Sequence, residues 1–186
     1  MSKHRKVRDL RFSKTLNLIA TASEDSTMKI WDTENMDVLS VVNLGAVKDV
    51  LAVHINEDKQ IISTACQNFT FLHDVRDPNR VIFKIPSNDG RWGVRSLDWL
   101  SSNVISIGGA VGRLSFFDLR TMTYLEHNSG KLWLQSGQGY IEHSDIYRNH
   151  FARQEVANAV YAHQLSPSKS KILIAGGPLM SGLKGR

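Results

Sequence analysis

The stretch Ser23-Glu24-Asp25-Ser26-Thr27-Met28-Lys29-Ile30-Trp31-Asp32 decides the fold. A turn of small polar residues leads into a short apolar run that ends on a Trp-Asp pair. Similar runs end on an Asp further along the chain, at Leu72-His73-Asp74 and at Phe117-Asp118. The intervals from Asp32 to Asp74 and from Asp74 to Asp118 are 42 and 44 residues. The chain is therefore built from an internal repeat.

This period and the Trp-Asp pair are typical of WD repeats, whose units of about 40–45 residues each form one four-stranded blade of a β-propeller. Each period divides into four short β-like runs separated by turn residues. We therefore predict an all-β fold, a partial WD-repeat β-propeller of about three blades and part of a fourth, within one domain that spans residues 1–186. The blades are expected at about residues 7–43, 47–86, 93–125 and, incomplete, 158–186.

The first unit has the clearest motif. Asp25, in the turn between its second and third runs, is expected to join the Trp31 indole and a Ser or Thr in a buried polar network. In the later units this turn reads Gln67-Asn68 or Ala110-Val111-Gly112, and neither box contains Trp. These units are predicted to be blades from their period and strand pattern rather than from their motifs.

An insertion at about residues 126–157 separates the third and fourth units. Ser144 is expected to cap a short helix within it. The aromatic residues of the insertion do not follow strand spacing. They either dock the insertion on the rim of the propeller or contact a partner. These aromatic residues are Trp133, Tyr140, Tyr147 and Phe151.

Composition narrows the possible functions. A net charge of +5 allows acidic partners, but nucleic acid is disfavoured because no aromatic-basic stacking pattern is present. No run is long enough for a membrane span, and the single Cys66 is predicted to be a buried thiol without a disulfide. We expect an intracellular protein, cytoplasmic and nuclear, that does not contact a membrane.

Catalytic motifs are not apparent in the sequence. It contains no nucleophile elbow, phosphate loop or paired zinc-ligand spacing, so we expect neither an enzyme nor a cofactor. His143 and His150 lie seven residues apart with no Cys nearby, so they are predicted to be surface residues rather than metal ligands.

Two boxes continue past their Asp to an arginine, as His73-Asp74-Val75-Arg76 and Phe117-Asp118-Leu119-Arg120. Here the sequence resembles the WD-repeat substrate receptors of cullin-4 RING ubiquitin ligases. The resemblance implies that Arg76 and Arg120 lie on the bottom face and contact the adaptor, damage-specific DNA-binding protein 1. Alternatively, each arginine pairs with the Asp two residues earlier or with a neighbouring blade.

The resemblance extends over nearly the whole chain, and it implies recognition of substrates that end in acidic residues, such as Glu-Glu, on the top face. Lys6, Arg8 and Arg95 are the candidate binding residues, because they lie where the first strands of two blades begin, and bidentate arginines suit carboxylates. Alternatively, Lys6 and Arg8 are solvated tail charges and Arg95 forms an inter-blade salt bridge. The segments that carry the resemblance are Lys6-Val7-Arg8, Gly93-Val94-Arg95-Ser96, Phe117-Asp118-Leu119-Arg120, Tyr147-Arg148-Asn149-His150-Phe151, Asn158-Ala159-Val160-Tyr161, Ala175-Gly176-Gly177-Pro178-Leu179 and Ser181-Gly182-Leu183.

The expected function is therefore that of a substrate-recognition subunit. It would bind acidic C-terminal tails and present them to the cullin-4 ligase through the adaptor. The alternative is a generic WD-repeat scaffold for protein-protein interactions in another complex.

Overall fold

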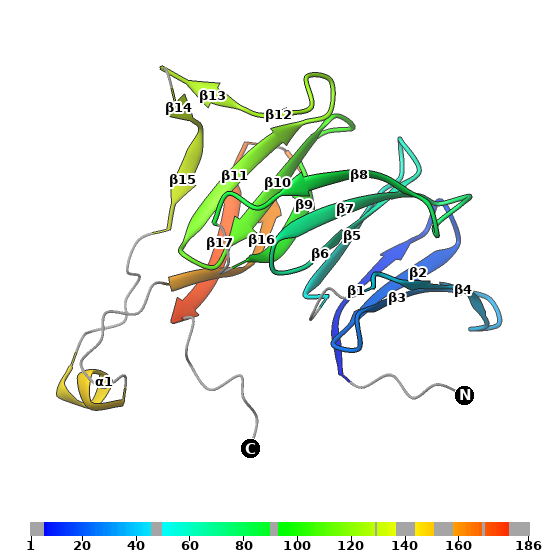
Figure 1. The fold of residues 1–186 in the computed structure, drawn as a ribbon, viewed down its shortest axis with the longest axis horizontal. Helices are drawn as coiled ribbons and strands as arrows, with labels where there is room; N and C mark the ends of the chain where they lie inside the picture. The colour runs from blue at the N-terminus through cyan, green and yellow to red at the C-terminus, as the bar shows by residue number, and fades with distance from the viewer. Residues whose placement is uncertain are drawn as a thin grey trace.

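The computed structural model describes residues 6–45, 50–89, 93–128, 130–136, 144–150, 158–168 and 170–178. Of the five antiparallel sheets in the described residues, four follow one another around an arc, as Figure 1 shows. Their innermost strands are neighbours, because β1 packs against β5, β5 against β9 and β9 against β16. The predicted all-β propeller architecture is confirmed.

The first two sheets have four strands each, in the order of the sequence. The first contains β1 (Val7–Ser13), β2 (Leu18–Ser23), β3 (Thr27–Asp32) and β4 (Val38–Asn43). The second contains β5 (Ala52–Asn56), β6 (Ile61–Ala65), β7 (Phe69–Asp74) and β8 (Val81–Pro86). Each of these sheets has the four strands that the four β-like runs of each period predicted.

The third sheet has a divided outer strand. Its inner strands are β9 (Val94–Trp99), β10 (Val104–Gly109) and β11 (Arg113–Asp118). Both β12 (Thr123–Tyr124) and β15 (Trp133–Gln135) pair with β11, and a small hairpin of β13 (Glu126–His127) and β14 (Gly130–Lys131) projects between them. The first part of the expected insertion thus contains strands, and β15 belongs to the third sheet. Trp133 lies against the Arg113 guanidinium, 5.0 Å from the ring centroid, as the rim-docking interpretation expects for this residue.

The rest of the described chain forms one short helix and a two-stranded sheet. Helix α1 (Asp145–His150) begins directly after Ser144, as predicted, and the Arg148 amide donates to the Ser144 carbonyl. Phe151 and Tyr140 lie outside the described residues. The fourth sheet consists of β16 (Asn158–Leu165) and β17 (Ile172–Pro178). The described part of the chain contains no helix long and apolar enough to cross a membrane.

Apolar side chains fill the spaces between neighbouring sheets. These side chains form two apolar clusters. Met28, Val53 and Ile62 are fully buried in one cluster, and Leu97 and Ile105 are fully buried in the other. Cys66 is fully buried, as predicted, and burial raises the pKa of its thiol.

The polar network of the first blade is present in part and is repeated in altered form. The Trp31 indole donates to the Thr21 hydroxyl at 3.0 Å, and Asp25 accepts hydrogen bonds from the amide and hydroxyl of Thr27. In the second blade His73 takes the place of the Trp and lies 3.3 Å from the Thr64 hydroxyl. The second blade therefore keeps the bond although its box lacks Trp.

Two carboxylates join consecutive blades. Asp9 on β1 accepts a hydrogen bond from the Val53 amide on β5 at 3.0 Å. Asp98 on β9 accepts one from the Leu165 amide on β16 at 2.8 Å. Each inner strand is thus held to another by a side-chain carboxylate as well as by apolar packing.

Candidate functional site

β-Bulges mark equivalent positions on three of the inner strands. The pairing register shifts between Val7 and Asp9, between the partners of Val94 and Ser96, and between Val160 and Ala162. The extra residues are Arg8, Arg95 and Tyr161, which we call the upper tier. Because bulges bend a strand and re-aim a side chain, they are common beside binding sites.

The two predicted arginines therefore hold the same place in the first and third blades. The Arg8 guanidinium lies 3.6 Å from the Glu24 carboxylate, and 24% of its side chain is exposed. Its buried Nε has no hydrogen-bond partner among the described residues. Arg95 is half-buried at the start of β9. Arg8 thus combines the ion pair of a structural residue with remaining hydrogen-bond capacity.

Lys6 lies directly before β1, at the same end as Arg8. Its side chain is exposed, while its carbonyl accepts hydrogen bonds from the Glu24 amide and the Ser23 hydroxyl. The main chain at Lys6 is thus fixed although the ammonium is free to reach solvent. This placement fits an end of the propeller that carries positive charge.

Tyr161 is a member of the upper tier that sequence reasoning did not identify. Its hydroxyl donates to the Pro178 carbonyl at 3.2 Å, which places the ring beside the end of β17. The insertion before the fourth blade breaks the repeat spacing, so only the pairing register of β16 shows that Tyr161 corresponds to Arg8 and Arg95.

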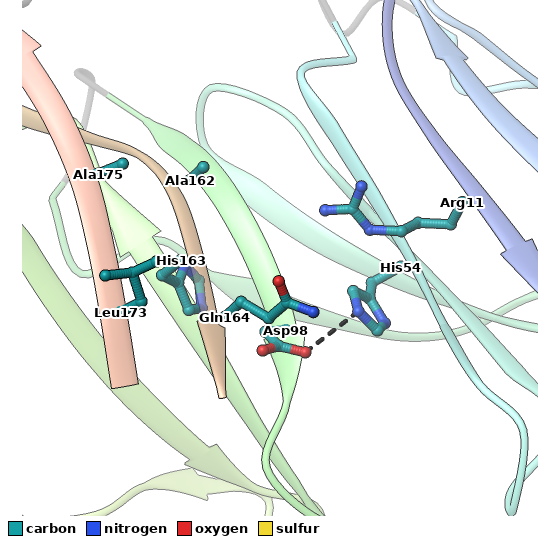
Figure 2. A pocket seen from close by; sticks show the side chains of 8 residues that line it. All are labelled: Arg11, His54, Asp98, Ala162, His163, Gln164, Leu173 and Ala175. Atoms are coloured by element: carbon teal, nitrogen blue, oxygen red, sulfur yellow. Dashed lines mark ion pairs between the residues drawn. The ribbon is translucent and has the colours of Figure 1, made fainter. Parts of the chain in front are cut away.

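Three residues further along each bulged strand lies a second set of equivalent residues. Arg11, Asp98 and Gln164 pair with Ala20, Ser106 and Leu173, and His54 on β5 occupies the same place opposite Ser63. We call Arg11, His54, Asp98 and Gln164 the lower tier. All four line a cavity of about 360 Å³ together with His163, Ala162, Leu173 and Ala175 (Figure 2).

An ion pair joins two members of the lower tier. The His54 Nε2 lies 3.1 Å from the Asp98 carboxylate, while its Nδ1 lies 3.2 Å from the Ile55 carbonyl. Burial alone raises the pKa of Asp98, but the hydrogen bonds from His54 and from the Leu165 and Trp99 amides outweigh burial and lower this pKa. Asp98 is therefore anionic at neutral pH and is saturated with donors.

His163 lies beside this pair in a different environment. Its ring nitrogens are 2.7 and 2.8 Å from the hydroxyls of Ser96 and Ser106, and the side chain is almost fully buried. Burial lowers the pKa of His163 to about 4. The ring is neutral at physiological pH, so it is a structural hydrogen-bonding group.

At the opposite end of the sheets, the structure pairs each predicted adaptor-binding arginine with its own Asp. Arg76 Nη2 lies 2.8 Å from Asp74, and Arg120 Nη2 lies 2.7 Å from Asp118. Hydrogen bonds from Arg76 lower the pKa of Asp74 to about 2. The arginine side chains are still 77% and 68% exposed, so each guanidinium also faces solvent. The local pairing that the sequence left open is present.

No group of three or more potential metal-binding side chains occurs in the described ranges. His143 lies outside them, and the side chain of His150 is not among those described. The histidine pair considered in the sequence is therefore left as a prediction.

Comparison with known proteins gives a match over the whole chain. Residues 1–186 match the family described as the DDB1- and CUL4-associated factor 12 beta propeller. Among solved structures, the chain is similar to the crystal structure of the computationally designed Ika4 protein, with a TM-score of 0.60 and 16% sequence identity. That match covers 95% of each chain, and at this identity it supports the fold alone.

Proposed function

The chain belongs to the DDB1- and CUL4-associated factor 12 beta-propeller family, and from this premise we propose that it is a substrate-recognition subunit of a cullin-4 RING ubiquitin ligase. In this role it binds a target protein, while the cullin-RING assembly transfers ubiquitin. The adaptor, damage-specific DNA-binding protein 1, links the two. Such a subunit acts in the cytoplasm and the nucleus.

The proposed ligand is an acidic C-terminal tail, such as Glu-Glu, bound by Lys6, Arg8 and Arg95. The observation that supports this assignment is the equivalence of Arg8 and Arg95, which occupy matching bulges on two inner strands. Guanidinium groups form short, charge-assisted hydrogen bonds with carboxylates. Glu24, which lies 3.6 Å from Arg8, orients that guanidinium, and a bound tail would compete with it.

A peptide titration tests this proposal. The full chain is expected to bind a fluorescent peptide that ends in Glu-Glu with a free C-terminus, and Arg8→Glu or Arg95→Glu should abolish binding because each reverses one charge at the site. Arg80→Glu, on an exposed arginine after β7, is the matched control and should bind normally. Equal affinity for a tail that ends in Gln-Gln would contradict the proposed ligand.

The adaptor is proposed to bind the opposite end, through the exposed sides of Arg76 and Arg120. Their pairing with Asp74 and Asp118 also suits a generic scaffold, in which both arginines only stabilise their own turns. Affinity purification of the full chain distinguishes the two functions. We expect the adaptor to be recovered with the wild type and to be at least several-fold depleted with Arg76→Ala/Arg120→Ala. Arg148→Ala, on α1, serves as the control, and absence of the adaptor from the wild-type sample would favour the scaffold.

A further inference from the structure

The lower tier contains unused hydrogen-bonding groups as well as saturated ones. Asp98 accepts from His54 and from two amides, so this pair closes one side of the cavity. Arg11 forms its side-chain hydrogen bonds through Nη1 alone, to Asp9 and to the Leu10 carbonyl. Within the described part of the chain, the N–H groups at Nε and Nη2 of Arg11 therefore remain available to donate hydrogen bonds.

Gln164 lines the same cavity from β16. Its side chain is exposed, and its carboxamide has no hydrogen-bond partner among the described residues. Figure 2 shows the Arg11 guanidinium and the Gln164 carboxamide approaching one space from β1 and from β16. A guanidinium edge and an amide N–H form a donor set that matches the two oxygens of a single carboxylate.

We propose that Arg11 and Gln164 bind the free α-carboxylate of the acidic tail, which enters the cavity with its C-terminus first. This inference rests on the proposed function and assigns the terminal carboxylate to the lower tier and the acidic side chains to the upper tier. The two tiers lie three residues apart along each strand, at most about 10 Å at the rise of an extended chain, which the last residues of an extended peptide span. Arg11 and Gln164 are binding residues, not catalytic ones.

The neighbouring acids restrict the lower tier to one carboxylate. Asp9 lies 2.9 Å from Arg11 Nη1, and Asp98 lines the same cavity as Gln164. Asp9 already occupies Nη1 of Arg11 and Asp98 already occupies Nε2 of His54, so a second negative charge at this depth would find no further cationic group in the lower tier, whereas the upper tier holds Arg8 and Arg95. The arrangement therefore favours a tail whose acidic side chains stay above its terminal carboxylate.

A comparison of two tails in several variants of the full chain tests the assignment. One peptide ends in Glu-Glu with a free carboxylate, and the other is the same peptide with a C-terminal amide. The wild type should bind the amide roughly tenfold or more weakly, since it loses a charge-assisted contact. Arg11→Gln should weaken binding of the free acid by about the same factor and reduce the amide penalty to about twofold.

Three further variants keep the test decisive. Gln164→Ala changes an exposed side chain, so it does not disturb folding, and it should lower the amide penalty severalfold. Arg8→Gln should weaken both peptides alike and retain the penalty, and Arg80→Gln should match the wild type. An unchanged penalty in both Arg11→Gln and Gln164→Ala overturns the inference but leaves the proposed function standing. Failure of the wild type to bind either peptide overturns both.

Discussion

His163 shows how a single buried residue couples the fourth sheet to the third. Its two ring nitrogens contact the hydroxyls of Ser96 on β9 and Ser106 on β10, and Ser96 also donates to the Val160 carbonyl. A neutral imidazole donates to one hydroxyl, here Ser96, and accepts from the other, Ser106, whose single proton is shared with the Asp98 carbonyl at 3.1 Å. A protonated ring would require both serines to accept and would place a charge in a buried site.

The stability of the protein should therefore depend on pH through His163. Burial lowers its pKa from 6.5 to about 4, so the unfolded state binds the proton more tightly than the folded state. The contribution of neutral His163 to the free energy of unfolding is complete above pH 6.5 and is lost as the pH falls toward 4. The total loss is on the order of 3 kcal/mol. Urea unfolding at several pH values measures it. His163→Gln should flatten the slope, whereas His127→Gln, at an exposed histidine, should not.

A steep slope that His163→Gln leaves unchanged would assign the pH dependence to other groups. His73 is the next candidate, because burial also lowers its pKa. His73→Gln would then identify which of the two histidines takes up the proton.

At the scale of the strand, the predictable elements are those with one buried face. The runs that became β2, β6 and β10 alternate or concentrate apolar residues because neighbouring sheets cover them. The strand β15 could not be predicted in this way. Trp133, Leu134 and Gln135 are all exposed, since an outer strand of a blade has little covering either face. Its identity depends on pairing with β11, which a local pattern does not record.

The residues of the candidate site also differ in how far the sequence could predict them. Arg8 and Arg95 were proposed because the resemblance implies an acidic ligand and both arginines stand where the first strand of a blade begins, and carboxylate binding by them stays a prediction. Arg11, His54 and Asp98 carry a weaker signal, namely polar residues at one phase of the repeat, 43 and 44 residues apart. They differ in charge, so only the shared cavity shows that they belong together. Gln164 and Tyr161 lie beyond the insertion, where the repeat phase is lost.

For the whole molecule, the arc depends on the junctions between blades. In the described chain, β1 and β5 share the bond from the Val53 amide to Asp9, and β9 and β16 share the bond from the Leu165 amide to Asp98. Each of these carboxylates also accepts from the amide that follows it and from a basic side chain. The same residues thus bridge blades and shape the lower tier, which links stability to the proposed binding site.

Asp98→Asn should weaken one of these junctions without changing the shape of the side chain. The amide keeps only one acceptor oxygen and no charge, so His54 and the Leu165 amide compete for it, at a cost of about 2–4 kcal/mol in the free energy of unfolding. Hydrogen exchange of the Leu165 amide should accelerate, while that of Val53 at the other junction should not. Urea denaturation gives the first quantity and exchange the second. The control Asp145→Asn changes a side chain that is 94% exposed, and it should match the wild type in both measurements.

Asp9→Asn, at the other junction, should produce the reverse exchange pattern. The losses in the free energy of unfolding from Asp9→Asn and Asp98→Asn should add within about 0.5 kcal/mol, because the junctions share no bonding partner. If both variants accelerate exchange at Val53 and Leu165 alike, the blades open as one unit and the junctions are not independent.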